Sequence, residues 1–234
     1  MNSAETNARD RLIIALDVPS SEEALDIVRE LEGEITTFKI GLQLYTAAGP
    51  EIVRAVSATG AKVFLDLKLH DIPNTVASAV ATAAELGVAM LTLHLSGGRR
   101  MLEAAVAKAP NDMLLLGVTV LTSSDEATLR ETGVESTVEE QALRLAAIAV
   151  ASGVGGLIAS PHEVATLRRC VGRETKIITP GVRPTWAAAD DQKRFTTPAQ
   201  ALQNGADYLV IGRPVTAQRD RREAVQRIIS EITA

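Results

Sequence analysis

Short apolar runs recur along this chain, and stretches with helical periodicity separate them. Eight such runs are present, each rich in valine, isoleucine and leucine rather than alternating between apolar and polar residues. Strands of this composition are typical of a parallel sheet that is buried on both faces. The runs occupy residues 12–16, 35–40, 61–67, 88–93, 113–120, 154–158, 176–179 and 208–211.

The segments between the runs carry the boundary signals of helices. Thr137 and Glu140 have the spacing of a capping box. Residues 160–163 (SPHE) combine a cap, a first-turn proline and a capping-box acid, and residues 197–200 (TPAQ) repeat that pattern. The sequence therefore predicts helices that include residues 22–31, 75–86, 138–151 and 163–171.

The regular alternation of strands and helices constrains the topology. It implies a parallel sheet with right-handed crossovers. Eight strand–helix units in 234 residues fit a (β/α)8 barrel, also called a TIM barrel, whose usual size is about 250 residues. We expect one α/β domain of this type over residues 1–234, with a flexible polar segment at residues 1–10. An open doubly wound sheet is the alternative.

Charge and composition argue against several classes of function. The net charge is −5 and aromatic residues make up 3% of the chain, whereas nucleic-acid-binding proteins usually present a basic face and stacking rings. No apolar run reaches the ~18 residues of a membrane span, and residues 1–10 lack the apolar region of a secretory signal. One cysteine excludes a disulfide within the chain. We expect a cytoplasmic protein that binds neither nucleic acid nor membranes.

Three charged residues crowd onto the end of the third run, in the sequence FLDLKLHDIPNTV. They are Asp66, Lys68 and Asp71. Because the side chains of a strand alternate between its faces, Phe64, Asp66 and Lys68 share one face. Charged groups are rarely buried unless they are paired. A solvated strand end would explain one or two of these charges, whereas an active-site cluster explains all of them.

Polar residues also follow the ends of the other predicted strands. In a (β/α)8 barrel, the active site lies at the C-terminal ends of the strands. Complementary charges at so many strand ends are hard to explain by packing, so we expect one site lined by them. His94 is more typical of a hydrogen-bonded structural residue than of a general base. The residues are Asp17, Lys39, His94, Thr122, Arg183, Gly212 and Arg213.

A phosphate site is predicted after the last strand, in the sequence IGRP. Phosphates in this fold bind the loops after strands 7 and 8. Gly212 would let backbone amides approach the anion, and the guanidinium of Arg213 can hold two phosphate oxygens. The long polar connection at residues 180–198 is typical of a lid. It offers Arg183 and Gln192 as donors to an anionic substrate.

Together these residues resemble the orotidine 5′-phosphate decarboxylase family, in its bacterial form, over nearly the whole chain. The D-x-K-x-x-D core alone is shared with sugar-phosphate relatives on the same fold. DLKLHDIPNTV together with PGVRP and DQKR is far more specific. The matching segments are IIALDV at 13–18, FKIGLQL at 38–44, FLDLKLHDIPNTV at 64–76, GVTVLTS at 117–123, PGVRP at 180–184, DQKRFTTP at 191–198 and YLVIGRP at 208–214.

The resemblance implies removal of CO2 from orotidine 5′-monophosphate to give UMP, the last step of de novo pyrimidine synthesis. It implies a homodimer with active sites at the interface, and neither a metal nor an organic cofactor. Lys68 matches the proton donor of the family, within a charged array. The other implied assignments are Lys39, Asp66 and Asp71 to the array, Asp17 and Lys39 to the ribose, Asp71 and Thr75 to the partner's site, Thr122 to the pyrimidine, and Arg183, Gln192, Gly212 and Arg213 to the phosphate end and its closing loop.

The chemistry of the implied reaction fits a lysine flanked by acids. Loss of CO2 from C6 of the pyrimidine leaves an electron pair in an sp2 orbital with little delocalisation. A fixed ammonium in a water-poor cavity stabilises that charge, and the same group can protonate the carbon. Neighbouring carboxylates keep Lys68 ionised and hold its position.

Two alternatives remain open at this point. A metal-dependent sugar-phosphate decarboxylase or aldolase shares the D-x-K-x-x-D core and stabilises an enediolate with Mg²⁺. Such an enzyme needs an additional acidic ligand near the end of the second strand, where this chain reads FKIGLQL. A non-catalytic nucleotide-phosphate binder would have no need of Lys68.

Overall fold

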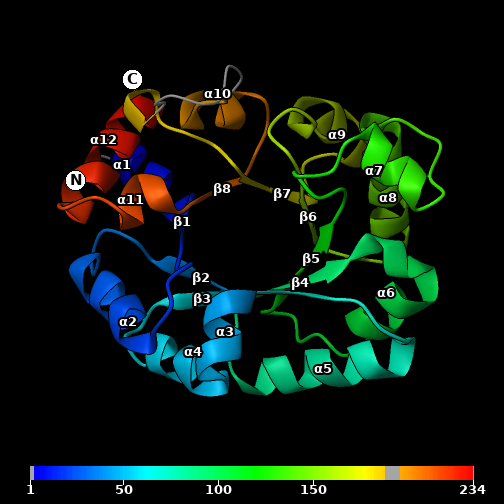
Figure 1. Cartoon of the computed structure of the whole chain (residues 1–234), viewed down its shortest axis with the longest axis horizontal. Helices are drawn as coiled ribbons and strands as arrows, with labels where there is room; N and C mark the ends of the chain where they lie inside the picture. The colour runs from blue at the N-terminus through cyan, green and yellow to red at the C-terminus, as the bar shows by residue number, and fades with distance from the viewer. Residues whose placement is uncertain (1–2, 188–195, 234) are drawn as a thin grey trace.

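The computed structural model describes residues 3–187 and 196–233. Its strands are all parallel and close into a barrel in the order β1 to β8, with helices around the outside (Figure 1). Because β1 pairs with both β2 and β8, the predicted (β/α)8 barrel is confirmed and an open sheet is excluded. The strands are β1 (Leu12–Ala15), β2 (Thr37–Gly41), β3 (Lys62–Leu69), β4 (Met90–His94), β5 (Leu114–Val118), β6 (Gly156–Ile158), β7 (Lys176–Pro180) and β8 (Tyr208–Ile211).

The helices of the described residues form the outer layer of the barrel (Figure 1). No helix in residues 3–187 and 196–233 is long and apolar enough to cross a membrane. The helices are α1 (Ser3–Asp10), α2 (Ser21–Glu30), α3 (Leu42–Ala48), α4 (Pro50–Ser57), α5 (Pro73–Glu85), α6 (Gly98–Val106), α7 (Glu126–Glu131), α8 (Val138–Ala151), α9 (Val164–Val171), α10 (Pro198–Gln203), α11 (Arg213–Thr216) and α12 (Arg221–Thr233), with short 3-10 turns η1 (Leu95–Gly97) and η2 (Thr185–Ala187).

The alternation of side chains along each strand creates two apolar regions. On β1, Ile14 faces the helices and belongs to the large outer core, whereas Ile13 faces the barrel axis. The inward-facing apolar residues form a compact plug inside the barrel. The buried members of the plug are Ile13, Ala15, Phe64, Met90, Leu116, Ile178 and Val210.

Two of the three predicted capping boxes form, and the third does not. Thr137 and Glu140 cap α8 reciprocally, and Thr197 and Gln200 cap α10 in the same way. In contrast, α9 begins at Val164 without a side-chain cap, because the predicted capping acid is its helical N-cap residue and is buried.

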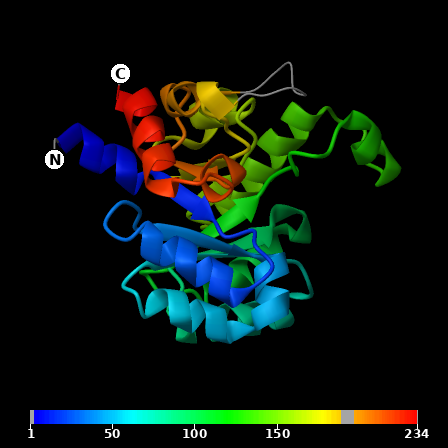
Figure 2. The same cartoon turned by 60° about the vertical axis from the view of Figure 1, so that its left-hand side comes forward.

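The N-terminal segment differs from the sequence-based expectation. Residues 1–10 are predicted to be flexible, but Ser3–Asp10 form α1, which lies beside α12 (Figure 2). Ala8 is buried, and Arg9 forms an ion pair with Glu34 at 2.6 Å. The contacts that order this segment come from distant parts of the chain, so the local sequence gives no sign of them.

Candidate active site

A cavity of about 930 Å³ opens at the C-terminal ends of the strands. Since all eight strands are parallel, their C-terminal ends meet on one face, and the residues that follow them converge there. The structure brings together in this cavity most of the predicted site residues. They are Asp17, Lys39, Asp66, Lys68, Thr122, Arg183, Gly212 and Arg213.

Acids and ammonium groups alternate along one edge of the cavity. Lys39 Nζ lies 2.9 Å from Asp17 Oδ1 and 3.6 Å from Asp66 Oδ2. Lys68 Nζ donates to both oxygens of Asp66, at 2.8 and 2.9 Å. The order is therefore Asp17, Lys39, Asp66, Lys68, with each charge next to opposite ones. We call these four residues the charged array.

Burial increases toward the middle of the charged array. The side chains of Lys39 and Asp66 are only 11% and 14% exposed, whereas Lys68 is 28% exposed and Asp17 is 59% exposed. Two opposite partners at the buried positions offset the desolvation of each charge, and removal of one partner from such a pair costs roughly 3–5 kcal/mol. The array therefore places Lys68, its more accessible ammonium, at the cavity surface.

The backbone at Lys68 explains how its side chain reaches the cavity. Lys68 has a φ of 51°. Among the residues that the structure describes, it is the one residue other than glycine with a positive φ. Such conformations cost roughly 1–3 kcal/mol and occur mainly where function requires them. The register between β3 and β4 also shifts here, from Leu65 opposite Leu91 to Leu69 opposite Leu93. The resulting bulge turns the end of β3, which is a common role of bulges near active sites.

The two histidines near the charged array pack against each other. The ring centroids of His70 and His94 are 5.6 Å apart and the rings are tilted by 45°. Burial lowers the pKa of His94 below 6.5, and the nearby His70 and Lys68 lower it further, while Asp66 acts in the opposite direction. The lowered pKa of His94 disfavours a second positive charge near Lys68.

Three arginine side chains also line the cavity. Arg183 follows β7, Arg213 follows β8, and Arg227 of α12 adds a third guanidinium to the lining. A Cβ placed on Gly212 would lie 3.6 Å from the Cβ of Ala15, an ordinary contact. It would also lie 4.0 Å from Asp17 Oδ2. Gly212 and the three arginines all line the cavity, and the missing side chain at Gly212 leaves its backbone accessible to an anion.

The start of the long polar connection is anchored to α12. The guanidinium of Arg227 lies 4.1 Å from the ring centroid of Trp186, a distance typical of a cation–π contact. The backbone N–H and the hydroxyl of Thr185 donate to Glu231 at 3.2 and 3.3 Å. Trp186 thus anchors the start of this connection by packing against Arg227 of α12. Gln192 lies outside the described residues, so its predicted role is not addressed by the geometry.

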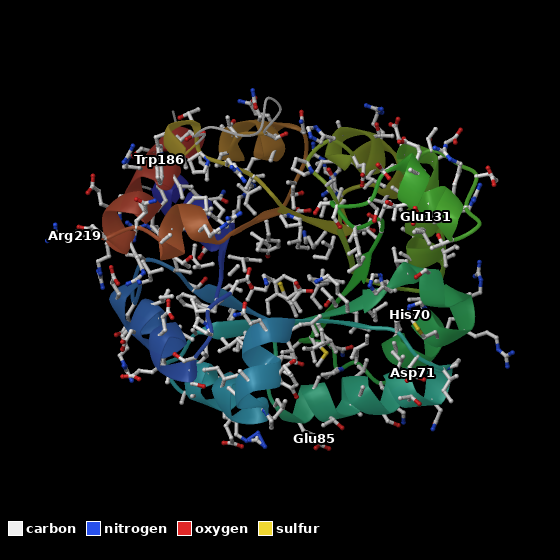
Figure 3. The ribbon with its side chains drawn as sticks, viewed as in Figure 1. His70, Asp71, Glu85, Glu131, Trp186 and Arg219 are labelled. Carbon is white, nitrogen blue, oxygen red and sulfur yellow. The ribbon has the colours of Figure 1, made fainter. Side chains whose placement is uncertain are left out.

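Three residues that the sequence placed at the site do not line the cavity. Within the described chain, its lining includes none of His94, Asp71 and Thr75. Asp71 and Thr75 are exposed, and Asp71 accepts a hydrogen bond from the backbone N–H of Ile72 at 2.6 Å. In Figure 3, Asp71 and Trp186 lie on opposite sides of the barrel. Within one chain, Asp71 is therefore not part of the charged array.

Sequence reasoning missed residues that shape the site. A Cβ on Gly41 would lie 3.1 Å from Lys39 Nζ and 3.2 Å from Asp17 Oδ1, so the glycine leaves room for their ion pair. Gly41 directly follows the second apolar run, and a glycine at a strand end could have indicated a close approach of side chains there. Arg227 and Thr92, which contacts the array from β4, carry no comparable signal in the sequence.

Comparisons with known proteins converge on one family. The family model described as "Orotidine 5'-phosphate decarboxylase / HUMPS family" matches residues 10–228. A protein of Syntrophotalea carbinolica named orotidine 5′-phosphate decarboxylase is 50% identical, with 97% of this chain and 96% of that protein covered. A second of the same name, from Geotalea daltonii, is 47% identical, with 97% and 98% covered.

A solved structure supports the same relationship. The crystal structure of orotidine 5′-phosphate decarboxylase from Lactobacillus acidophilus superposes with a TM-score of 0.84 at 35% identity, covering 96% of this chain and all (100%) of that chain. That similarity extends over the barrel and the strand ends that form the cavity.

Proposed function

The chain belongs to the orotidine 5′-phosphate decarboxylase / HUMPS family, and we propose that it removes CO2 from orotidine 5′-monophosphate to give UMP, the last step of de novo pyrimidine biosynthesis. The observation that carries this proposal is the charged array, which presents the ammonium of Lys68 at the surface of the cavity. A carboxy-lyase of this kind needs a fixed positive charge where the carbanion develops.

Lys68 is assigned two successive roles. As the C6–CO2 bond breaks, its electron pair remains on C6, and the ammonium stabilises that pair electrostatically. Lys68 then donates a proton to C6 and becomes a neutral amine. Asp66 holds the ammonium with both of its oxygens, so little reorganisation is needed at the moment of reaction. Proton uptake from water would restore the ammonium.

The remaining cavity residues are assigned to binding. Asp17 and Lys39, which line the cavity, are assigned to the ribose hydroxyls, and Thr122, which also lines it, is assigned to the pyrimidine. Arg183, Arg213 and the backbone at Gly212 suit the phosphate, with Gln192 assigned to the closing loop. The phosphate is remote from the bond that breaks, yet its binding free energy can orient the reacting ring. The mechanism requires neither a metal nor an organic cofactor.

We further propose that the active enzyme is a homodimer with composite sites. The exposed residues Asp71 and Thr75 would reach into the partner's cavity and complete its array. Large apolar side chains around the same end of the barrel support an interface, since Ile72, Leu42 and Leu121 are 66%, 55% and 41% exposed. Exposed apolar surface of this kind is typical of interaction sites, and each of the three residues follows the C-terminal end of a strand, on the face that carries the cavity.

An ultraviolet assay with orotidine 5′-monophosphate tests the proposed reaction. The expected result is an absorbance change matched by equal amounts of UMP and CO2, and turnover that persists in excess EDTA. Binding without turnover would instead support a nucleotide-phosphate binder. Loss of turnover on chelation would support the metal-dependent sugar-phosphate chemistry.

A further inference from the structure

One hydroxyl group bonds both the carboxylate of Asp66 and the backbone N–H of Lys68, the two groups of β3 that define the position of the lysine. Thr92, on β4, is fully buried, and its Oγ1 donates to Asp66 Oδ1 at 2.9 Å. The same oxygen accepts a hydrogen bond from the backbone N–H of Lys68, also at 2.9 Å. A threonine hydroxyl has one proton to donate and lone pairs to accept, so both bonds are satisfied at once.

The strand register explains why this hydroxyl is needed. Leu65 pairs with Leu91 and Leu69 pairs with Leu93. Three residues of β3 therefore lie opposite the single residue Thr92 of β4, and the regular ladder is interrupted there. A buried N–H that loses its ladder partner requires another acceptor. The side chain of Thr92 supplies that acceptor to Lys68, at the residue whose φ is positive.

We propose that Thr92 is a positioning residue for the decarboxylation, which rests on the proposed function above. Its hydroxyl fixes the carboxylate that holds the Lys68 ammonium and, at the same time, fixes the bulged backbone from which Lys68 extends. Thr92 is absent from the lining of the cavity within the described chain, so it acts through Asp66 and Lys68 rather than on the substrate.

The position of Thr92 predicts that loss of its hydroxyl lowers kcat much more than it weakens ligand binding. Loss of the hydroxyl removes a donor from Asp66 and an acceptor from the partly buried N–H of Lys68, which loosens the ammonium that is proposed to act in the transition state. The residues assigned to the phosphate follow β7 and β8. Of the residues assigned to the ribose, Lys39 lies 3.6 Å from Asp66 Oδ2 but keeps its own ion pair with Asp17 at 2.9 Å. A change of Thr92 should therefore lower kcat by roughly tenfold or more, with KM and the Kd for UMP changed by less than about threefold.

The test uses a set of variants of the full chain. Thr92→Val keeps the shape of the side chain and removes the hydroxyl. Thr92→Ser keeps the hydroxyl and should retain most of kcat. Thr179→Val is the matched control, because Thr179 is also a buried strand threonine, and its hydroxyl has no hydrogen-bond partner among the described residues. We expect Thr179→Val to match the wild type in kcat.

The outcomes separate this inference from the proposed function. If the wild type turns over orotidine 5′-monophosphate and Thr92→Val stays within about twofold of its kcat, or loses kcat and UMP affinity together, the role of Thr92 is overturned. If Thr92→Val does not fold, Thr92→Ser and Thr92→Ala decide, because they differ by the hydroxyl alone. Equal kcat in that pair overturns the role. A wild type that leaves the substrate unchanged overturns both proposals.

Discussion

The ammonium of Lys68 contacts both carboxylate oxygens of Asp66, at 2.8 and 2.9 Å, although the two residues are separated by a single position in β3. Neighbouring inward-facing side chains on a regular strand run side by side. The bulge and the positive φ of Lys68 turn the ammonium back onto the carboxylate. The acid therefore restrains the lysine from one side and leaves the cavity side free to meet a ligand.

Replacement of Lys68 tests the proton donor directly. Lys68→Ala should lower kcat by many orders of magnitude and leave UMP affinity largely intact, because the ammonium is proposed to act in the transition state. Steady-state kinetics and UMP titration measure the two effects. Lys62→Ala is the control, since Lys62 is an exposed lysine at the opposite end of the same strand. Retention of more than roughly a tenth of wild-type kcat, about 1.4 kcal/mol in the barrier, would refute the role of Lys68.

Replacement of Arg213 tests its proposed contact with the substrate phosphate. A charge-assisted hydrogen bond contributes about 1.5–3 kcal/mol, so Arg213→Ala should weaken UMP binding roughly ten- to hundredfold. The affinity for the free nucleoside uridine should hardly change, since it lacks the phosphate. Calorimetric titration of both ligands measures the difference. Arg173→Ala, at an exposed arginine after α9, should change neither. Equal losses for nucleotide and nucleoside would count against the assignment.

Mixed dimers test whether the sites are shared between chains. If Asp71 completes the partner's site, Lys68→Ala and Asp71→Ala chains combined in one dimer form one site that carries both changes and one intact site. Co-expression should then recover roughly a quarter of wild-type activity, because about half of randomly paired dimers are mixed and each has one intact site. Each variant alone should remain nearly inactive.

A second mixture provides the control for the mixed dimers. Asp66→Asn combined with Lys68→Ala should recover no activity, because Asp66 and Lys68 belong to the same chain and both sites stay damaged. A monomeric wild type in light scattering, or the absence of recovery with Asp71→Ala, would contradict composite sites.

The parts of this site that follow local rules could be predicted from the sequence. Parallel strands bring their C-terminal ends to one face, so residues at those ends, such as Lys39 and Asp66, were expected to meet and do so. Alternation along β3 also predicted that Phe64 and Asp66 face the same way, and both line the cavity.

Other features depend on contacts between distant residues and could not be predicted locally. Thr92 lies in the run MLTLH, where a β-branched residue is ordinary strand composition, and only the β3–β4 bulge gives its hydroxyl two partners. Asp71 belongs to the same motif as Lys68 but lies outside the cavity, because the chain leaves the barrel at that point. Residues 160–163 resemble a capping box, yet Glu163 is itself the buried N-cap residue of α9 and its side chain makes no capping hydrogen bond.

The burial of Glu163 predicts a pH-dependent stability. Desolvation raises the pKa of Glu163 from 4.5 to about 7, and the charge of Glu139 on α8 adds to the effect, while the backbone of Ser160 opposes it. One carboxylate oxygen of Glu163 has no hydrogen-bond partner among the described residues. Because the folded-state pKa is the higher one, the folded state binds more protons between pH 4.5 and 7. The stability contributed by the protonated acid is complete below pH 4.5 and is lost as the pH rises through 7.

Glu163→Gln removes this titration and keeps the shape of the side chain. Its thermal midpoint should exceed that of the wild type by a few degrees at about pH 8, since 1 kcal/mol corresponds to roughly 2–4 °C in a chain of this size. The difference should shrink toward zero near pH 4.5, where the wild-type acid is protonated. Differential scanning calorimetry across this range measures the effect. Glu131→Gln, at an exposed position of α7, should show no such trend, and a constant difference for Glu163→Gln at every pH would contradict the prediction.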